Sequence, residues 1–321
     1  MTLRPIIAVT RALPGSLNLP NAEIRPGPQD KPDRDWVLRH IAGTHAVVTM
    51  FSDKVDSHFL DAAGPNLRIV ANFAVGYDNI DLSACRARGV AVSNTPHAVT
   101  EGTADLAWLL ILAAARHLPA ADRFARSGQW AQRGTLAMND FLGQDLTGKT
   151  LLIVGAGRIG HATALRSLGW GMRILYTARS KHWDFELAPL AATRVPLDEG
   201  LAQADAVSIH CPLTPETKHL INRDRLALMK PTAILVNTAR GPVVDEHALA
   251  DALATGRLYA AGLDVFEHEP QIHPALTASD RVVMTPHIGS AAARYREMMT
   301  AMVADNIAAA LAEREPPNRV A

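Results

Sequence analysis

The chain has 321 residues, of which 48% are hydrophobic, and its 32 basic side chains balance 32 acidic ones. This length and composition are typical of a globular protein with two domains, and a net charge of zero gives no reason to expect nucleic acid or a membrane as a partner. Two cysteines, Cys85 and Cys211, are too few for a disulfide framework, so we expect a cytoplasmic protein.

The first 99 residues alternate between short apolar runs and helical patterns. The apolar runs predict parallel strands, and the stretches between them predict helices. The expected strands are residues 6–9, 46–50 and 67–73, and the expected helices are residues 33–41 and 56–63. The intervening proline-rich stretch 13–32 predicts a loop. This part of the chain therefore predicts a first α/β domain.

A glycine-containing turn, with Val75 and Gly76 at its centre, follows the third of these strands. A glycine directly after a strand end exposes backbone N–H groups that can form a small anion-binding nest. A simple turn without a ligand explains the same residues, and the pattern alone leaves both interpretations open.

Residues 100–118 predict a long helix with Thr100 as its N-cap. Its apolar stretch, residues 106–115, is too short to span a bilayer and predicts a buried helix. The segment 128–148 that follows is polar and irregular. We expect Trp130 within it to reach a second subunit.

Residues 151–160, LLIVGAGRIG, carry the clearest functional motif. Four apolar residues predict a buried strand, and Gly155-x-Gly157-x-x-Gly160 turns the chain into a helix. The first glycine permits a tight turn, the second lets backbone approach a pyrophosphate, and the third allows close packing of helix on strand. The phosphates are expected over the free N–H groups at the helix N-terminus, so the motif predicts a dinucleotide site.

The alternation continues to the end of the chain and predicts a doubly wound parallel sheet. Expected strands are residues 151–154, 173–177, 193–195, 206–210, 233–237, 260–265 and 282–285, with helices at 158–168, 222–229 and 245–255. A last helix, residues 290–313, is expected to pack on the first domain. The fold class expected is α/β, with two Rossmann-like doubly wound parallel-sheet domains. We expect residues 1–99 with 290–321 to form a discontinuous substrate-binding domain and residues 100–289 to form the NAD(P)-binding domain.

The end of the second strand of the nucleotide-binding domain predicts which dinucleotide binds. NAD-binding units place a carboxylate there for the ribose 2′-hydroxyl. This chain instead has Arg179, Ser180 and Lys181, and its first carboxylate is Asp184. A guanidinium matches a phosphate, so we expect NADP(H), with NAD(H) as the alternative cofactor. A solvated basic loop without a ligand is the other interpretation.

Three strand ends downstream carry candidate catalytic residues. Carbonyl reduction needs a proton donor, and His287 is suited to that task, with Glu269 orienting its ring and favouring the imidazolium. Arg240 is suited to bind a carboxylate and to polarise the adjacent carbonyl. In an open α/β sheet the carboxyl ends of the strands form the ligand crevice, so we expect these side chains to lie close together.

The ordered motifs resemble those of the D-isomer-specific 2-hydroxyacid dehydrogenases, and among them the glyoxylate/hydroxypyruvate reductases. The resemblance covers nearly the whole chain and implies a homodimer joined through its cofactor domains. The motifs that carry it are residues 75–78 (VGYD), 155–160 (GAGRIG), 239–241 (ARG) with 243–246 (VVDE), 264–266 (DVF) and 285–290 (TPHIGS).

The resemblance implies roles for individual residues. Arg240, Glu269 and His287 are the catalytic residues, and Asp264 orients the nicotinamide carboxamide. The substrate, a small 2-ketoacid or 2-hydroxyacid, is bound by Ser52, Val75, Gly76 and Arg240. The cofactor-binding residues are Thr103, Gly155, Gly157, Arg158, Ile159, Gly160, Arg179, Ser180, Lys181, Cys211, Pro212, Thr217, Thr238, Ala239, Asp264, His287 and Gly289. No metal is expected.

Three functions fit these residues, and the first is favoured. It is NADPH-preferring reduction of glyoxylate, hydroxypyruvate or a similar 2-ketoacid to the D-2-hydroxyacid. The second is a dehydrogenase of the same fold for another small anion, such as formate or phosphite. Formate dehydrogenases of this fold carry glutamine where Glu269 stands, which argues against formate. The third is a non-enzymatic nucleotide-sensing protein, whose long flanking tails this chain lacks.

Overall fold

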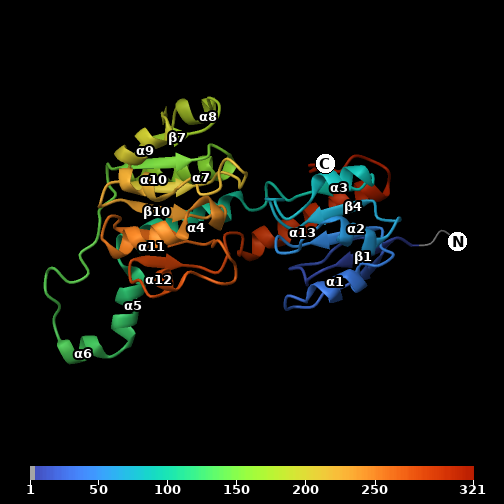
Figure 1. Ribbon diagram of the computed structural model, residues 1–321, viewed down its shortest axis with the longest axis horizontal. Helices are drawn as coiled ribbons and strands as arrows, with labels where there is room; N and C mark the ends of the chain where they lie inside the picture. Colours follow the sequence, from blue (N-terminus) through green and yellow to red (C-terminus); the bar gives the residue numbers. More distant parts are fainter. Residues whose placement is uncertain (1–3) are drawn as a thin grey trace. The chain divides into compact units, whose positions relative to one another are not determined.

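The computed structural model describes residues 4–321 and divides the chain into two compact units (Figure 1). Unit 1 consists of the chain up to Val99 together with Ser290–Ala321, and unit 2 is Thr100–Gly289. Each unit has its own parallel sheet and its own buried apolar core. The expected fold class is therefore confirmed.

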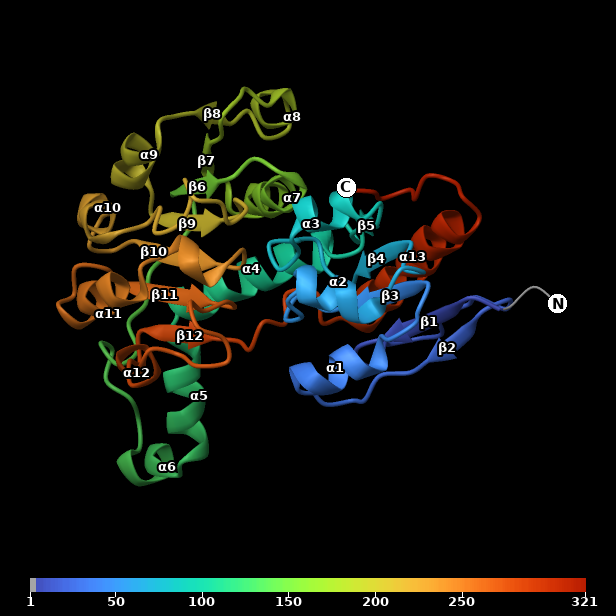
Figure 2. The ribbon, with the colours of Figure 1, turned by 45° about the vertical axis from the view of Figure 1, so that its right-hand side comes forward.

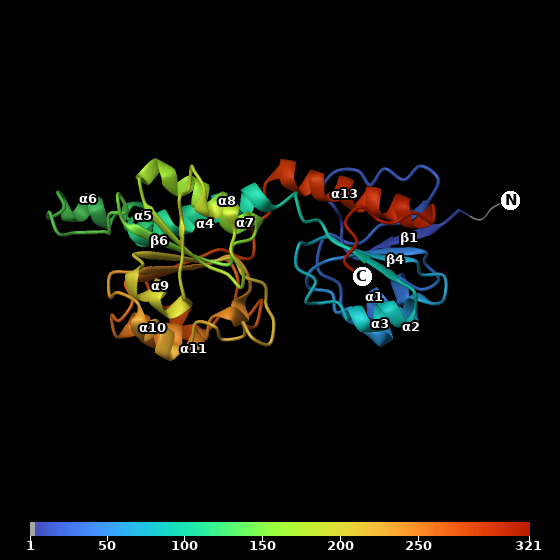
Figure 3. The same cartoon turned by 90° about the horizontal axis from the view of Figure 1, so that it is seen from above.

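Unit 1 is a three-layer α/β structure. Its strands are β1 Ile6–Val9, β2 Glu23–Arg25, β3 Ala46–Thr49, β4 Ile69–Asn72 and β5 Ala91–Ser93, and its helices are α1 Arg34–His40, α2 Ser57–Ala63, α3 Leu82–Ala87 and α13 Ala293–Leu311. The strands are all parallel, in the order β2-β1-β3-β4-β5. Helices α1, α2 and α3 cover one face of the sheet and α13 covers the other (Figure 3). The strand order reverses between β1 and β3, and open α/β sheets bind ligands at the carboxyl ends of such a pair.

Local sequence explains why these elements form. Strands β3 and β4 are buried along their whole length, as expected for a sheet covered on both faces. Helices α1, α2 and α3 each begin after an aspartate, and Asp33, Asp56 and Asp81 accept a hydrogen bond from the backbone amide three residues further on.

Unit 2 is a second doubly wound sheet. Its strands are β6 Thr150–Val154, β7 Arg173–Thr177, β8 Thr193–Arg194, β9 Ala206–Ile209, β10 Ile234–Asn237, β11 Ala260–Leu263 and β12 Val282–Met284. Its helices are α4 Thr100–Ala115, α5 Leu118–Arg126, α6 Gln129–Arg133, α7 Arg158–Arg166, α8 Trp183–Glu186, α9 Leu197–Gln203, α10 Arg223–Leu228, α11 Glu246–Ala254 and α12 Pro274–Thr277, with 3₁₀ turns η1 Ser167–Trp170 and η2 Gly241–Val243. The strands are all parallel, in the order β12-β11-β10-β9-β6-β7-β8. Helices α4, α7 and α8 lie on one face, and α9, α10 and α11 lie on the other (Figure 3). The order reverses between β6 and β9, which places the glycine motif after β6 at the ligand-binding end.

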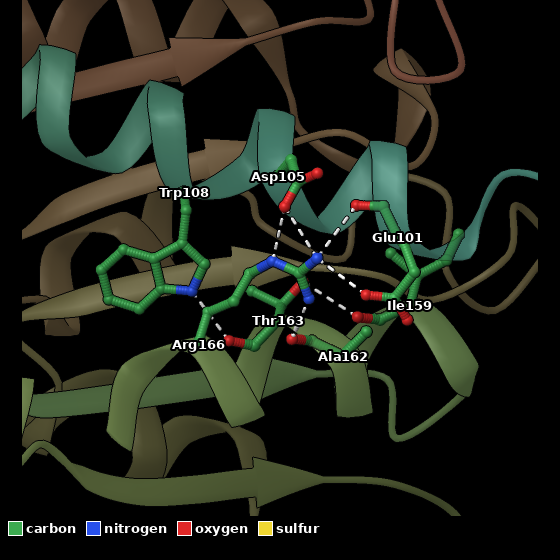
Figure 4. Close-up of polar contacts among 7 residues, drawn as sticks. All are labelled: Glu101, Asp105, Trp108, Ile159, Ala162, Thr163 and Arg166. Atoms are coloured by element: carbon green, nitrogen blue, oxygen red, sulfur yellow. Dashed lines mark hydrogen bonds and ion pairs between the residues drawn. The ribbon is translucent and has the colours of Figure 1, made fainter. Parts of the chain in front are cut away.

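Helices α4 and α7 are joined by polar contacts at their exposed edge (Figure 4). The Arg166 guanidinium donates to Asp105 and to Glu101, both at 2.8 Å. Further along, the buried Trp108 indole N–H donates to the Thr163 carbonyl at 2.8 Å. Because α7 is the helix that the glycine motif opens, these contacts fix the start of α4 against the nucleotide motif.

The structure also contains strand β5 and helix α3, which were not expected, and the helix expected at residues 158–168 ends at Arg166. Three further differences have a clear physical reason. Strand β2 lies within the stretch 13–32 that was expected to be a loop, because residues 23–25 pair with β1. The long helix ends at Ala115 instead of residue 118, because His117 takes a left-handed conformation and Pro119 stands in the first turn of α5. The segment 128–148 contains the short helix α6 and is not wholly irregular.

Helices α5 and α6 form an arm that projects away from the unit 2 sheet (Figure 2). In residues 4–321, no single helix is long and apolar enough to cross a membrane. The bent pair of α4 and α5 passes that test of length and composition only when the two helices are taken together, with an angle of 67° between them.

Candidate active site

The turn after β6 is shaped for a pyrophosphate. Gly155 has a φ of +106°, and a Cβ there would lie 2.6 Å from the Cys211 amide nitrogen. A Cβ on Gly160 would lie 2.3 Å from the Gly155 carbonyl oxygen, whereas a Cβ on Gly157 would meet nothing within 4 Å. Helix α7 begins at this open position with no side-chain cap, so its N–H groups are available to an anion. The residues present fit a dinucleotide.

The end of β9 forms the opposite wall of this turn. Burial raises the pKa of Cys211 to about 11 and lowers that of the preceding His210 to about 3, so both side chains are uncharged at neutral pH. The Thr217 hydroxyl donates to the Pro212 carbonyl at 2.7 Å and accepts from the Thr214 amide at 2.7 Å. Through these two hydrogen bonds, Thr217 stabilises the conformation of the loop after Cys211.

The hydroxyl of Thr238 is buried at the end of β10 and has no hydrogen-bond partner in the described part of the chain. A buried hydroxyl without a partner costs free energy unless a ligand or water satisfies it. The sequence motif placed Thr238 and Ala239 among the cofactor residues, and this orphaned hydroxyl fits that role.

The loop after β7 contains the three residues expected to recognise a 2′-phosphate. Arg179 and Ser180 are exposed. Lys181 instead pairs with Glu186 at 2.7 Å and lies 4.0 Å above the Trp183 ring. The loop is basic, as expected, but one of its two cations already has a carboxylate partner.

A close approach of two loops places Arg240 beside the loop after β11. A Cβ on Gly241 would lie 1.9 Å from the Phe266 carbonyl carbon, so only glycine fits there. The Arg240 guanidinium donates to its neighbour, the Ala239 carbonyl, at 2.8 Å, and Asn237 holds the Arg240 carbonyl at 2.8 Å. Arg240 is thus fixed by local contacts on both sides.

His287 and Glu269 form a hydrogen-bonded pair. The distance between His287 Nδ1 and Glu269 Oε2 is 2.8 Å, and the other Glu269 oxygen accepts from the Phe266 amide at 3.0 Å. Burial acts to raise the pKa of Glu269, but the hydrogen bond from His287, the Phe266 amide and the charge of Arg240 together hold it below its ordinary value. The carboxylate is therefore ionised at neutral pH.

Asp264 holds the loop that carries His287. One of its carboxylate oxygens accepts from the Thr285 hydroxyl at 2.6 Å and the Ile288 amide at 2.8 Å, and the other accepts from the Gly289 amide at 2.8 Å. Burial raises the pKa of Asp264, against the effect of these hydrogen bonds. His287 itself has a φ of +55°, a conformation that an L-residue seldom adopts without such support.

Thr103 of α4 closes the same end of unit 2. A Cβ on Gly289 would lie 3.2 Å from an Asp264 carboxylate oxygen and 3.3 Å from the Thr103 side chain. Thr103, Asp264 and Gly289 are therefore neighbours. In the described residues, no group of three or more His, Cys, Asp or Glu side chains is arranged to hold a metal ion.

In unit 1, the turn after β4 has the features of an anion nest. Asn94 donates to the Val75 carbonyl at 2.7 Å, and Asn72 donates to the Gly76 carbonyl at 2.8 Å. Within residues 4–321 the amides of Val75 and Gly76 donate to no other group, so they are free for a ligand.

Ser52 lies after β3, at the switch point of the unit 1 sheet. Asp53 shapes its turn by accepting from the Met50 amide at 2.8 Å and the Thr10 hydroxyl at 2.5 Å. The Ser52 hydroxyl is buried and lacks a hydrogen-bond partner among the described residues. Such an orphaned group at a switch point is a candidate ligand contact.

Several supporting residues carried no recognisable sequence signal. Asn72 and Asn94 each support a carbonyl of the nest, and Arg194 lies beneath the basic loop after β7. Asn94 and Arg194 each act across neighbouring strands, whereas Asn72 acts within the turn that follows its own strand. His210 had a weak signal, because it directly precedes the Cys211–Pro212 pair.

The fold and this set of strand-end residues define a dinucleotide-dependent oxidoreductase. A family model described as the NAD-binding domain of D-isomer-specific 2-hydroxyacid dehydrogenases matches residues 108–289. The chain is 51% identical over 289 residues to a glyoxylate reductase of Thermococcus onnurineus, covering 89% of this chain and 86% of that one. It is 47% identical over 324 residues to a glyoxylate reductase of Thermococcus kodakarensis, covering 99% and 96%. The chain belongs to the D-isomer-specific 2-hydroxyacid dehydrogenases and is an NAD(P)-dependent enzyme.

Solved structures agree with this family. The TT0316 protein of Thermus thermophilus superposes with a TM-score of 0.91 at 41% identity, covering 98% of this chain and 100% of that one. An NADPH-dependent glyoxylate/hydroxypyruvate reductase of Sinorhizobium meliloti, in complex with NADP and malonate, superposes with a TM-score of 0.85 at 33% identity, covering 99% and 97%.

Proposed function

We propose that this enzyme reduces glyoxylate, hydroxypyruvate or a similarly small 2-ketoacid to the D-2-hydroxyacid and prefers NADPH. The observation that carries the proposal is the His287–Glu269 pair, 2.8 Å apart, with the charge of Arg240 acting on the same carboxylate. A proton donor, its orienting carboxylate and a guanidinium are the groups that reduction of a 2-ketoacid requires. The names of the similar glyoxylate reductases support the same substrate class.

Four residues of unit 2 have distinct tasks in this reaction. When bound, the reduced nicotinamide supplies the hydride. Arg240 binds the substrate carboxylate and polarises the keto oxygen, and its contact strengthens as negative charge develops there. His287 donates a proton to that oxygen, and Glu269 keeps the ring oriented and stabilises its protonated form. Asp264 holds the His287 loop through its three hydrogen bonds.

The remaining site residues have roles that follow from their contacts. In unit 1, the free amides of Val75 and Gly76 and the orphaned hydroxyl of Ser52 bind substrate. In unit 2, the Gly155–Gly160 turn binds the pyrophosphate. On this basis we assign cofactor binding to unit 2, and we assign substrate binding to these unit 1 groups in addition to Arg240.

We also propose that the enzyme is a homodimer whose interface includes the α5–α6 arm. Large apolar side chains stand exposed there, with Leu118 of α5 at 51% and Trp130 of α6 at 52% relative exposure. Burial of such side chains against a second subunit is favourable.

Steady-state kinetics tests the proposed reaction. The unmodified enzyme is expected to reduce glyoxylate and hydroxypyruvate with a higher kcat/KM for NADPH than for NADH. In Arg240→Lys, kcat/KM for both ketoacids should fall by roughly 10²-fold or more, because an ammonium cannot bond two oxygens in one plane. A direct titration should show NADPH affinity within about twofold of normal, since the phosphates are held elsewhere. Near-normal turnover in Arg240→Lys would remove this residue from the reaction.

A further inference from the structure

Arg194 lies at the edge of the unit 2 sheet, on strand β8. It stands opposite Tyr176 of β7 in the strand register, so it lies close to the start of the basic loop that follows β7. Figure 2 shows β8 beside β7, with α8 close by. The side chain is exposed and forms no ion pair with any residue between 4 and 321.

The Arg194 guanidinium binds the backbone of that loop. Its Nε and Nη2 donate to the Ala178 carbonyl at 3.1 and 2.9 Å, and Nη2 also donates to the Arg179 carbonyl at 3.0 Å. Two successive peptide groups are therefore fixed, which sets the direction in which the Arg179 side chain leaves the backbone. The far end of the loop is held separately, because the His182 amide donates to the Tyr176 hydroxyl at 3.0 Å.

Lys181 stands in a different electrostatic setting. Its ammonium lies 2.7 Å from Glu186, and the Tyr176 hydroxyl donates to the other Glu186 oxygen at 2.7 Å. The hydrogen bond from Lys181, followed by that from Tyr176, holds the pKa of Glu186 below its ordinary value. Glu186 is therefore ionised at neutral pH. It forms an ion pair with Lys181, whereas Arg194 acts on it only through a weaker Coulombic interaction and donates its N–H groups to carbonyl oxygens.

We propose that Arg194 is a positioning residue for the 2′-phosphate of NADPH, and that it, rather than Lys181, is the second cation supporting Arg179. This inference rests on the proposed NADPH preference. Arg194 acts by fixing the peptide groups from which Arg179 reaches the phosphate and by adding positive charge beneath the loop.

Binding of two small probes to the full chain tests the inference. The probes are 2′,5′-ADP, which carries the 2′-phosphate, and 5′-AMP, which lacks it, both titrated by calorimetry. In Arg194→Gln, the Kd of 2′,5′-ADP should rise about fivefold to tenfold, the effect of losing one net hydrogen bond and some charge, while the Kd of 5′-AMP changes by less than about twofold. Arg194→Lys should be intermediate, because it keeps the charge but reaches fewer carbonyls.

Two further variants make the comparison specific. Lys181→Gln should change the Kd of 2′,5′-ADP by less than about threefold, because Glu186 already offsets its charge. Arg173→Gln is the matched control: this arginine lies at the opposite end of β7, donates to Gln203 at 2.8 Å, and carries the same charge. It should change neither Kd.

The outcomes separate this inference from the cofactor proposal. If Arg194→Gln weakens both probes equally, Arg194 only stabilises the sheet edge and the inference is wrong. If Lys181→Gln gives the larger selective loss, the assignment of the second cation is wrong while NADPH preference stands. If the unmodified enzyme binds both probes equally, the NADPH preference fails and the role of Arg194 fails with it.

Discussion

At the scale of single residues, the proposed chemistry depends on backbone positions that few residues can occupy. His287 adopts a φ of +55° and is held there by the loop contacts of Asp264. Glu269 then meets the ring through one oxygen and the Phe266 amide through the other. Orientation of the imidazole is therefore enforced from two directions, which is what a general acid requires.

The pH dependence of reduction should report the His287–Glu269 pair. His287 donates a proton only in its protonated form, so the rate falls as the pH rises. In Glu269→Gln the ring loses its partner carboxylate, and this alkaline fall should move to lower pH, as expected for loss of an adjacent opposite charge. An unchanged pH profile in Glu269→Gln would show that the two residues do not act together.

Removal of the proposed general acid should abolish most of the turnover. His287→Ala should lower kcat by at least ~10²-fold while NADPH still binds.

The same pair contributes to stability with a defined sign. The folded protein holds the pKa of Glu269 below its ordinary value. The contribution is therefore present at neutral pH and is lost as the pH falls through that lowered pKa.

At Gly241 the loop that carries Arg240 packs closely against the loop that carries Phe266, so no larger residue fits at position 241. Gly241→Ala places a Cβ 1.9 Å from the Phe266 carbonyl carbon. The forced shift should lower the free energy of unfolding by about 1–3 kcal/mol and should reduce kcat/KM as well, because Arg240 moves with the backbone. Denaturant unfolding and kinetics check both effects. Gly169→Ala, where a Cβ meets nothing within 4 Å, is the control; equal effects in the two variants would contradict the explanation.

At the scale of elements, helix α4 is held to α7 by one buried hydrogen bond and an exposed charge network (Figure 4). The Trp108 indole is 5% exposed and also stacks on Trp170, with ring centroids 4.7 Å apart. The Arg166 pairs are more exposed and are expected to contribute less, because solvent screens them.

Trp108→Phe should therefore lower the free energy of unfolding more than the same substitution of a surface tryptophan does. It leaves the Thr163 carbonyl without its indole donor, and the free energy of unfolding should fall by about 1–3 kcal/mol. Trp183→Phe, at a side chain that is 62% exposed, should change it by less than about 0.5 kcal/mol. Chemical denaturation of both variants measures the difference, and a neutral Trp108→Phe would show that α4 does not depend on this bond.

At the scale of the whole molecule, the seven strands of unit 2 all come from residues 150–284, and its core is built from its own side chains. A domain with a complete sheet and core is expected to fold alone. The unit also contains the Gly155–Gly160 turn and the basic loop after β7. Cofactor binding should therefore be separable from substrate turnover.

A fragment of residues 100–289 tests this separation. It should fold cooperatively and bind NADPH with an affinity within about tenfold of the full chain, because the phosphate contacts are retained. It should show no reduction of glyoxylate, because Ser52, Val75 and Gly76 are missing. The same fragment with Gly160→Ala is the control, since a Cβ there would lie 2.3 Å from the Gly155 carbonyl oxygen. A folded fragment that fails to bind NADPH would contradict the assignment of cofactor binding to unit 2.

Sequence by itself determined the alternation of strands and helices, the glycine motif and the strand-end positions of Arg240, Glu269 and His287. These features depend on local patterns: apolar runs for buried strands, and glycine where a turn needs it. Boundaries were less well determined, as at Ala115 and in the short strand β2, because pairing and packing override weak local preference.

Only the tertiary structure decided which residues support the proposed site. Asn94 holds the Val75 carbonyl, Gly241 packs on Phe266, and Arg194 holds the Ala178 carbonyl. In each case the two partners lie on different strands or on the loops that follow them. Their proximity follows from the order of strands in the sheet. No local sequence pattern encodes that order, so the sequence alone does not predict these contacts.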